Sequence, residues 1–165
     1  MKTKYVINVV NLIGDKTRIF EMLEEIKRDE LGVGSVDFNK VIPVPVDGSV
    51  SDHWYLDNWG TCQNTVTYMD FNVYEPVEIA ENIIEIAFET IANAALPIVA
   101  KMADMNQDLS FVYTWAEDTL IGNDCGRYIY VNGTCVSRYQ PSGKEAVLFS
   151  CEVWDVDPEE IIMPY

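Results

Sequence analysis

Apolar residues occur along the chain first at strand-like and then at helix-like spacing, and the order of these segments restricts the fold more than any other feature. Apolar and β-branched residues run from Tyr5 to Ile13, which predicts a first strand. After Gly14, apolar residues recur at helical spacing as far as Leu31, which predicts an amphipathic helix that ends near Gly32. A strand followed at once by such a helix indicates a mixed fold of α and β elements.

The alternation continues after a long connection at residues 33–63. We expect a strand at residues 63–74, a helical turn at 77–82, a strand at 84–89, a helix at 92–106 and a strand at 109–115. In the strand at 84–89, the apolar side chains face one way and Glu85 and Glu89 face the other. The main elements follow the split βαβ order of a ferredoxin-like α+β sandwich.

The C-terminal part adds further strands to this sandwich. Asn132-Gly133 lies between two alternating segments and is a strong hairpin signal, so residues 126–131 and 134–139 are its expected arms. A last strand is expected at 146–153, followed by an acidic tail at 155–165 with a helical turn after Pro158. The prediction is one domain over 1–165: a ferredoxin-like core at about 4–118, then the added hairpin and strand at about 124–154.

Composition sets limits on what the chain does. It has 165 residues, of which 48% are hydrophobic and 12% aromatic, enough for a folded core, which excludes disorder as the main state. No apolar run is long enough for a membrane span, and we expect no leader before the first strand. We therefore expect a cytoplasmic protein whose four cysteines, which show no CxxC spacing, are reduced thiols: Cys62, Cys125, Cys135 and Cys151.

Charge is distributed unevenly. Residues 1–40 hold seven basic and seven acidic residues, whereas residues 41–165 hold four basic and twenty acidic ones, so the net charge of −16 belongs to the later part. Such a charge argues against direct binding of nucleic acid phosphates. Two interpretations stay open: a solubilising surface, or an acidic face for a basic partner. The candidate acidic residues in the middle of the chain are Glu75, Glu78, Glu81, Glu85 and Glu89.

The long connection carries three aromatic residues within six positions, Trp54, Tyr55 and Trp59, with Asn58 between them. Aromatic side chains in a loop are good anchors for a protein partner or a stacked ring. The alternative is that the segment folds back and its rings cover one face of the sheet. Gly60 then allows a tight turn.

Catalytic patterns are weak. His53 is the single histidine and has no nucleophile at a recognisable spacing, and Cys62 lies in an acidic segment that disfavours its thiolate. A zinc site needs three or four good ligands, and there is no glycine-rich phosphate loop. We therefore predict no catalytic residue, no metal site and no cofactor.

Four segments resemble the YubB-type ferredoxin-like family, whose members have no known function and are carried by phages, plasmids and other mobile elements. They are Asn8-x-Val-Asn-Leu-Ile-Gly14, Phe38-Asn-Lys-Val-Ile-Pro43-x-Pro45, Trp54-Tyr-x-x-Asn58-Trp-Gly-Thr61 and Phe88-x-Thr90. The resemblance covers roughly residues 5–135 and implies a ferredoxin-like fold without an iron–sulfur cluster. Cys62-Gln63 and residues 91–95 depart from the family pattern, so an activity that relatives carry there is either absent or replaced.

Together these observations predict a non-enzymatic protein–protein interaction module of mobile-element type. Its acidic surface would engage a basic nucleic-acid-binding protein, with imitation of nucleic acid as one mechanism. The alternative is a small enzyme or ligand-binding protein that uses the aromatic loop at 52–63. A protein that only assembles with itself is a third interpretation.

Overall fold

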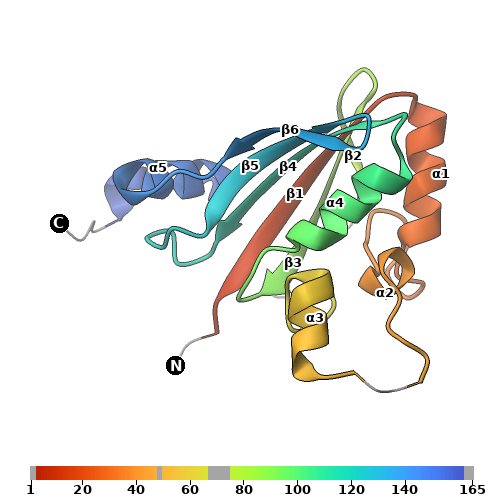
Figure 1. Ribbon diagram of the computed structural model, residues 1–165. Coiled ribbons are helices and arrows are strands. Elements are labelled where there is room, and N and C mark those ends of the chain that lie inside the picture. The colour runs from red at the N-terminus through yellow and green to blue at the C-terminus, as the bar shows by residue number, and fades with distance from the viewer. Residues whose placement is uncertain (1–2, 48–49, 67–74, 162–165) are drawn as a thin grey trace.

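The computed structural model describes residues 3–47, 50–66 and 75–161, and their strands form one six-stranded antiparallel sheet (Figure 1). The strand order is β2-β3-β1-β4-β5-β6. The predicted α+β fold is therefore confirmed. The strands are β1 (Tyr5–Ile13), β2 (Val77–Ala80), β3 (Ile83–Ile91), β4 (Ser110–Glu117), β5 (Cys125–Val131) and β6 (Thr134–Tyr139).

The side chains of β1 alternate between two differently covered faces of this sheet. Even-numbered residues such as Val10 and Leu12 are fully buried on the first face. That face is covered by α1 (Lys16–Ile26) and α4 (Leu96–Met105), and both helices contribute buried residues to one core. Asp15 caps α1, because its side chain accepts a hydrogen bond from the backbone N–H of Arg18.

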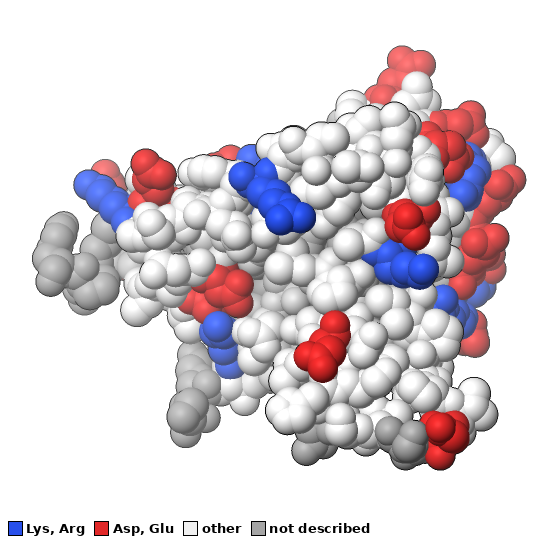
Figure 2. Space-filling model, in the orientation of Figure 1, with Lys and Arg blue, Asp and Glu red and all other residues white. Residues whose placement is uncertain are grey.

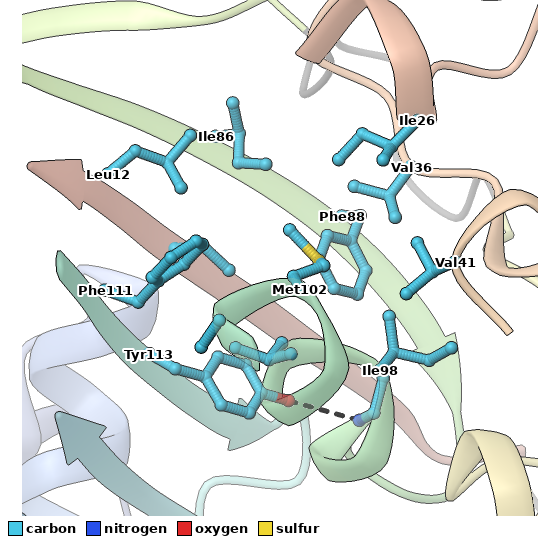
Figure 3. Packing of buried hydrophobic residues seen from close by; sticks show 14 of the residues in the cluster. Leu12, Ile26, Val36, Val41, Ile86, Phe88, Ile98, Met102, Phe111 and Tyr113 are labelled. Carbon is cyan, nitrogen blue, oxygen red and sulfur yellow. Dashed lines mark hydrogen bonds between the residues drawn. The ribbon is translucent and has the colours of Figure 1, made fainter. Parts of the chain in front are cut away.

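The main core lies between the first face and these two helices (Figure 3). Phe88 and Phe111 of the sheet pack near Ile98 and Met102 of α4, and all four side chains are at most 1% exposed. The alternation of apolar residues in β3 predicted from the sequence is confirmed by the burial of Ile84, Ile86 and Phe88. Two residues that follow α1, Val36 and Val41, close the same core.

The long connection contains two short helices, α2 (Phe38–Val41) and α3 (Asp52–Trp59). The side chain of Asp37 caps α2 by accepting a hydrogen bond from the backbone N–H of Asn39. α3 ends at Gly60, whose φ of +81° is the left-handed conformation that glycine adopts without strain. A side chain there would also collide with Pro97 and with the carbonyl of Ala94.

The predicted last strand at 146–153 is wrong, because these residues belong to the helix α5 (Gly143–Trp154). Ala146, Phe149 and Val153 follow one another at three- and four-residue spacing, so a helix places them together on the second face of the sheet. There they pack with Ile7 and other residues of the central strands in a second, smaller core. α5 therefore covers that face instead of extending the sheet beyond β6.

Other boundaries differ less. The helical turn expected at 77–82 is wrong: the β-branched residues Val77 and Ile79 form the edge strand β2 on β3. α1 ends at Ile26, before the predicted Gly32. The hairpin around Asn132-Gly133 is confirmed, and the turn after Pro158 is the 3-10 helix η1 (Pro158–Glu160). Of the strand expected at 63–74, residues 67–74 lie outside the described part, and Val66 bridges to Glu89.

Candidate functional site

The aromatic residues predicted as partner anchors pack onto the protein itself. Trp59 is 4% exposed, and its Nε1 atom donates a hydrogen bond to the carbonyl of Ile42 at 2.9 Å. Its ring meets Phe38 edge to face, with the two centroids 5.7 Å apart. The prediction that Trp59 contacts a partner is therefore wrong, because its ring is part of the main core.

Trp54 and Tyr55 lie at the margin of the same cluster and are half-buried. Both rings meet Trp59 edge to face, at centroid distances of 5.7 and 5.0 Å. Asn58 is also half-buried, and its amide donates to the carbonyl of Trp54 within the helix. The connection thus folds back onto the protein, which was the alternative that the sequence left open.

The acidic residues in the middle of the chain do not form one patch. Glu75, Glu78 and Glu81 are exposed near the edge strand β2, and Glu78 pairs with Lys16 at 2.6 Å. Glu85 points to the second face of the sheet and is half-buried. Glu89 is 0% exposed, so its assignment to an interaction surface is wrong. Strand alternation does place Glu85 and Glu89 on the face opposite the main core, but the side chain of Glu89 has no solvent-exposed surface there.

The candidate nucleophiles and metal ligands do not meet in a catalytic arrangement. His53 and Cys62 are exposed, and burial raises the pKa of the Cys125 and Cys151 thiols, which makes these two less reactive. Within the described ranges, no three His, Cys, Asp or Glu side chains group as a metal site. No helix there is long and apolar enough to cross a membrane.

The exposed side of α5 carries a surface that the sequence reasoning did not identify. Glu145, Leu148, Glu152 and Asp155 follow at three- and four-residue spacing, so they lie along one side of the helix. We call these four residues the acidic stripe. All four are exposed, and Leu148 keeps 43% of its surface accessible between the carboxylates.

The charges of this region are not neutralised locally. Between Gly143 and Glu160 there are six acidic residues and one basic residue, Lys144. All six carboxylates are exposed, and none forms an ion pair with a residue in the described part of the chain. The region therefore has a negative surface potential that would attract a basic partner from solution.

A hollow lies beside the acidic stripe, between α5 and the edge strand β6. It has a volume of about 250 Å³ and is lined by Tyr139, Glu145, Leu148, Phe149 and Glu152. Tyr139 meets Phe149 edge to face at 5.7 Å and still has 44% of its surface exposed. The hollow thus joins apolar surface to two carboxylates.

A local signal for α5 is present in the sequence. Ser142 and Glu145 have the S-x-x-E spacing that often starts a helix, and the structure places Ser142 at the N-cap position. The helix ends at Asp155, which adopts a left-handed φ of +54°. Reading that spacing together with the apolar positions at 146, 149 and 153 would have favoured a helix over a strand.

Comparisons with known proteins give the fold and nothing finer. No family model matches the chain, and no curated protein is similar to it in sequence. Among solved structures, it is similar to the crystal structure of a protein api92 from Yersinia pseudotuberculosis, of the family model DUF1281. The TM-score is 0.50 at 12% sequence identity, and the match covers 65% of this chain but only 40% of the api92 chain.

Proposed function

We propose that the protein is a non-enzymatic interaction module whose acidic stripe binds a basic segment of a partner protein. One observation carries the proposal: six exposed carboxylates of α5 and the following turn form no ion pair with any described residue, and they lie next to an apolar hollow at β6. A segment with lysine or arginine residues around one apolar side chain complements this surface. Its cations would meet Glu145 and Glu152 while its apolar side chain enters the hollow.

Near α1, in contrast to the acidic stripe, several acidic side chains are paired with basic ones, which supports the acidic stripe as the binding surface. Basic residues of α1 and of the residues that follow it are held in ion pairs, among them Lys27 with Glu24 and Lys40 with Asp29. Figure 2 shows acidic and basic side chains interleaved along the edge of the molecule at α1. A basic partner would meet less net negative charge there than at α5.

The partner class follows from the same chemistry. Glu145 and Glu152 are seven residues apart, which is about 10.5 Å along a helix axis. Exposed carboxylates that have no local counter-charge are attracted to basic grooves that otherwise hold phosphates. We therefore propose a basic nucleic-acid-binding protein as the partner, with nucleic acid imitation as the mechanism.

The finer fold and family assignments belong to this proposal. The order β2-β3-β1-β4, with α1 after β1 and α4 after β3, supports a ferredoxin-like core to which β5, β6 and α5 are added. Membership of the YubB-type family and a mobile-element origin rest on the sequence segments described above.

Binding of a defined probe tests the proposal. The full chain is titrated by calorimetry with a lysine-rich peptide that carries a central leucine, at 50, 150 and 500 mM NaCl. The double variant Glu145→Gln, Asp155→Asn should bind at least tenfold more weakly at 50 mM. Asn is well tolerated at a left-handed position, so the second change leaves the end of α5 intact. Affinity should fall steeply with salt.

The matched control removes the same charge elsewhere. Glu21 and Glu25 of α1 are exposed and have no ion pair with a described residue, so Glu21→Gln, Glu25→Gln changes the net charge equally. This control should bind within about twofold of the unchanged protein. Equal losses in both double variants would show that net charge alone attracts the peptide, and would overturn the proposed surface.

A competition assay tests the imitation mechanism separately. A fluorescent DNA duplex is bound to the same lysine-rich peptide, and the full chain is added at 50 mM NaCl. The chain should release the duplex, and the α5 double variant should release far less. Formation of a ternary complex without release would leave the docking surface intact but exclude imitation of nucleic acid.

A further inference from the structure

The second face of the sheet contains a cavity that shares only Glu152 with the acidic stripe. It has a volume of about 230 Å³ and lies beside the C-terminal end of α5, where the helix stops covering the strands. Four strands and the helix contribute to its wall. The lining residues are Val9, Asn11, Glu85, Thr114, Arg127, Glu152 and Val153.

Arg127 is held in place within this cavity and still has free donors. Its Nε atom donates to the hydroxyl of Thr114 at 3.1 Å, and its guanidinium lies 5.2 Å from the centre of the Phe149 ring. The terminal nitrogens have no acceptor within the described ranges, and no carboxylate there lies within 4.0 Å. A guanidinium so positioned is suited to bind a carboxylate by two hydrogen bonds.

The two carboxylates of the cavity are also available. Glu85 comes from β3 and Glu152 from α5, and neither pairs with a cation of the described residues. The cavity therefore holds charges of both signs, Arg127 on β5 against Glu85 on β3 and Glu152 on α5. Such a cavity complements a ligand that brings an ammonium together with a carboxylate.

The polar wall has an unmet hydrogen bond. The Oδ1 atom of Asn11 is buried and accepts no hydrogen bond from the described residues. An unsatisfied buried carbonyl costs roughly 1–3 kcal/mol, so such atoms are uncommon where no ligand or water is used. Since Asn11 lines the cavity, a half-turn of its amide would present this oxygen to an ammonium group.

We propose that this cavity binds a small amino acid, with the carboxylate on Arg127 and the ammonium between Glu85 and Glu152. The side chains of Val9 and Val153 supply apolar contact for the carbons between the two charged ends. Glu85 and Arg127 lie on strands that are separated by β1 and β4, and they are offset by two residues along the strands, which puts their Cα atoms about 16 Å apart. The ligand must therefore be long enough to bridge the gap that remains between the Glu85 carboxylate and the Arg127 guanidinium.

A series of amino acids of increasing length tests the site and measures this span. The full chain is titrated by calorimetry with glycine, β-alanine, 4-aminobutyrate and 6-aminohexanoate at low salt. One member should bind at least tenfold more tightly than butyrate or butylamine, which each carry only one of the two charges. Methyl NMR signals of Val9 and Val153 should shift on binding, which places the ligand in this cavity.

Variants of the charged residues test which of them bind the amino acid. Arg127→Gln and Glu85→Gln should each weaken binding at least tenfold, and Arg127→Lys should restore part of it. Arg138→Gln is the matched control, because Arg138 also stacks on an aromatic ring, 5.4 Å from the centre of Tyr128, but does not line the cavity. Each variant is first shown to keep a dispersed NMR spectrum.

Two results would overturn the inference. Equal binding of butyrate and the amino acids would show that Glu85 and Glu152 play no part, and no binding by any amino acid at 10 mM would exclude the class. The variants used here leave Glu145 and Asp155 unchanged, and those of the peptide experiment leave Arg127 and Glu85 unchanged. Failure of one proposal is therefore distinguishable from failure of the other.

Discussion

Two asparagines of β1 lie on opposite faces of the sheet and differ in their hydrogen bonding. Asn8 is 0% exposed on the first face, where its amide donates to Thr90 and its Oδ1 accepts from the backbone N–H of Ala95 and from the hydroxyl of Tyr113. Asn11, on the second face, has a buried Oδ1 atom without a donor among the described residues. The first face is thus a satisfied core, whereas the second keeps polar groups available for other molecules.

The network around Asn8 also explains how α4 begins without a side-chain cap. Ala95 occupies the cap position, and its backbone N–H donates to the hydroxyl of Tyr113 at 3.1 Å (Figure 3). The same N–H also donates to the Oδ1 atom of Asn8. Burial raises the pKa of the Tyr113 phenol well above its ordinary value, so the hydroxyl stays protonated. The polar groups of this face therefore serve the fold.

The largest expected difference between the two faces concerns apolar side chains. Phe88→Ala should lower the free energy of unfolding by about 3–5 kcal/mol, because a fully buried ring leaves a cavity under α4. Ile13→Ala on the second face should cost about 1 kcal/mol, because Ile13 is only half-buried there. Urea denaturation of both variants measures this. Equal losses would show that the second face is as tightly packed as the first.

The asparagines give the next effect. Asn8→Leu should cost about 3 kcal/mol, because it removes the partners of several buried polar groups at once. Asn11→Leu should change stability by less than about 1 kcal/mol in either direction, since it removes an acceptor to which no described residue donates. A large loss for Asn11→Leu in urea denaturation would mean that this side chain has a structural role in the fold.

Thiol labelling probes how well α5 covers the second face. Cys62 is exposed and should react at once with a thiol reagent at pH 8, whereas Cys125 and Cys151 are buried and should react roughly a hundredfold more slowly. Rapid labelling of Cys125 would show that α5 readily separates from the sheet. The buried side of α5 would then be less protected from solvent than the structure indicates.

The same two thiols give a pH dependence of defined sign. Burial raises the pKa of Cys125 and Cys151 above the ordinary value of 9.0, so the unfolded chain loses these protons first. Their contribution is therefore present below pH 9.0 and is lost as the pH rises through the folded-state values. The urea midpoint should fall between pH 8 and pH 10.5, and Cys125→Ala should reduce that fall. An identical fall in Cys125→Ala would contradict this assignment.

The smallest effect compares charges on α1 and α5. Glu24→Gln removes an ion pair with Lys27 and should lower the urea midpoint slightly. Glu152→Gln removes an exposed carboxylate from the last turn of α5, where the helix dipole disfavours a negative charge and where no described residue forms an ion pair with it, so it should leave the midpoint unchanged or raise it. Both shifts should shrink in 500 mM NaCl. Shifts of the same sign at low salt would mean that the acids of α5 have cationic partners.

Local chemistry explains which elements were predictable. The Asn132-Gly133 hairpin follows from a turn in which both residues have positive φ, 53° and 77°, which depends on two adjacent residues alone. β1 and β3 follow from runs of alternating apolar residues. Residues 146–153 fit both a strand and a helix, and the second face of the sheet, which exists only in the folded chain, selects the helix.

The candidate sites were less predictable, because exposure is a property of the tertiary structure. The aromatic segment around Trp59 has the composition of a binding loop, yet α3 turns its rings onto Phe38 and the main core. The charge surplus after residue 40 was visible in the sequence, but not its separation into a buried Glu89, a paired Glu78 and an unpaired acidic stripe.

The sequence by itself determined the strands β1 and β3, the hairpin at Asn132-Gly133 and the acidic excess, because these follow from residues close together in the chain or from composition alone. Only the tertiary structure decided which face α5 covers, where Arg127 lies relative to Glu85, and which carboxylates remain exposed. Those relations join residues more than forty positions apart, such as Glu85 and Arg127, and they arise only when the apolar sides of the strands and helices are buried against one another.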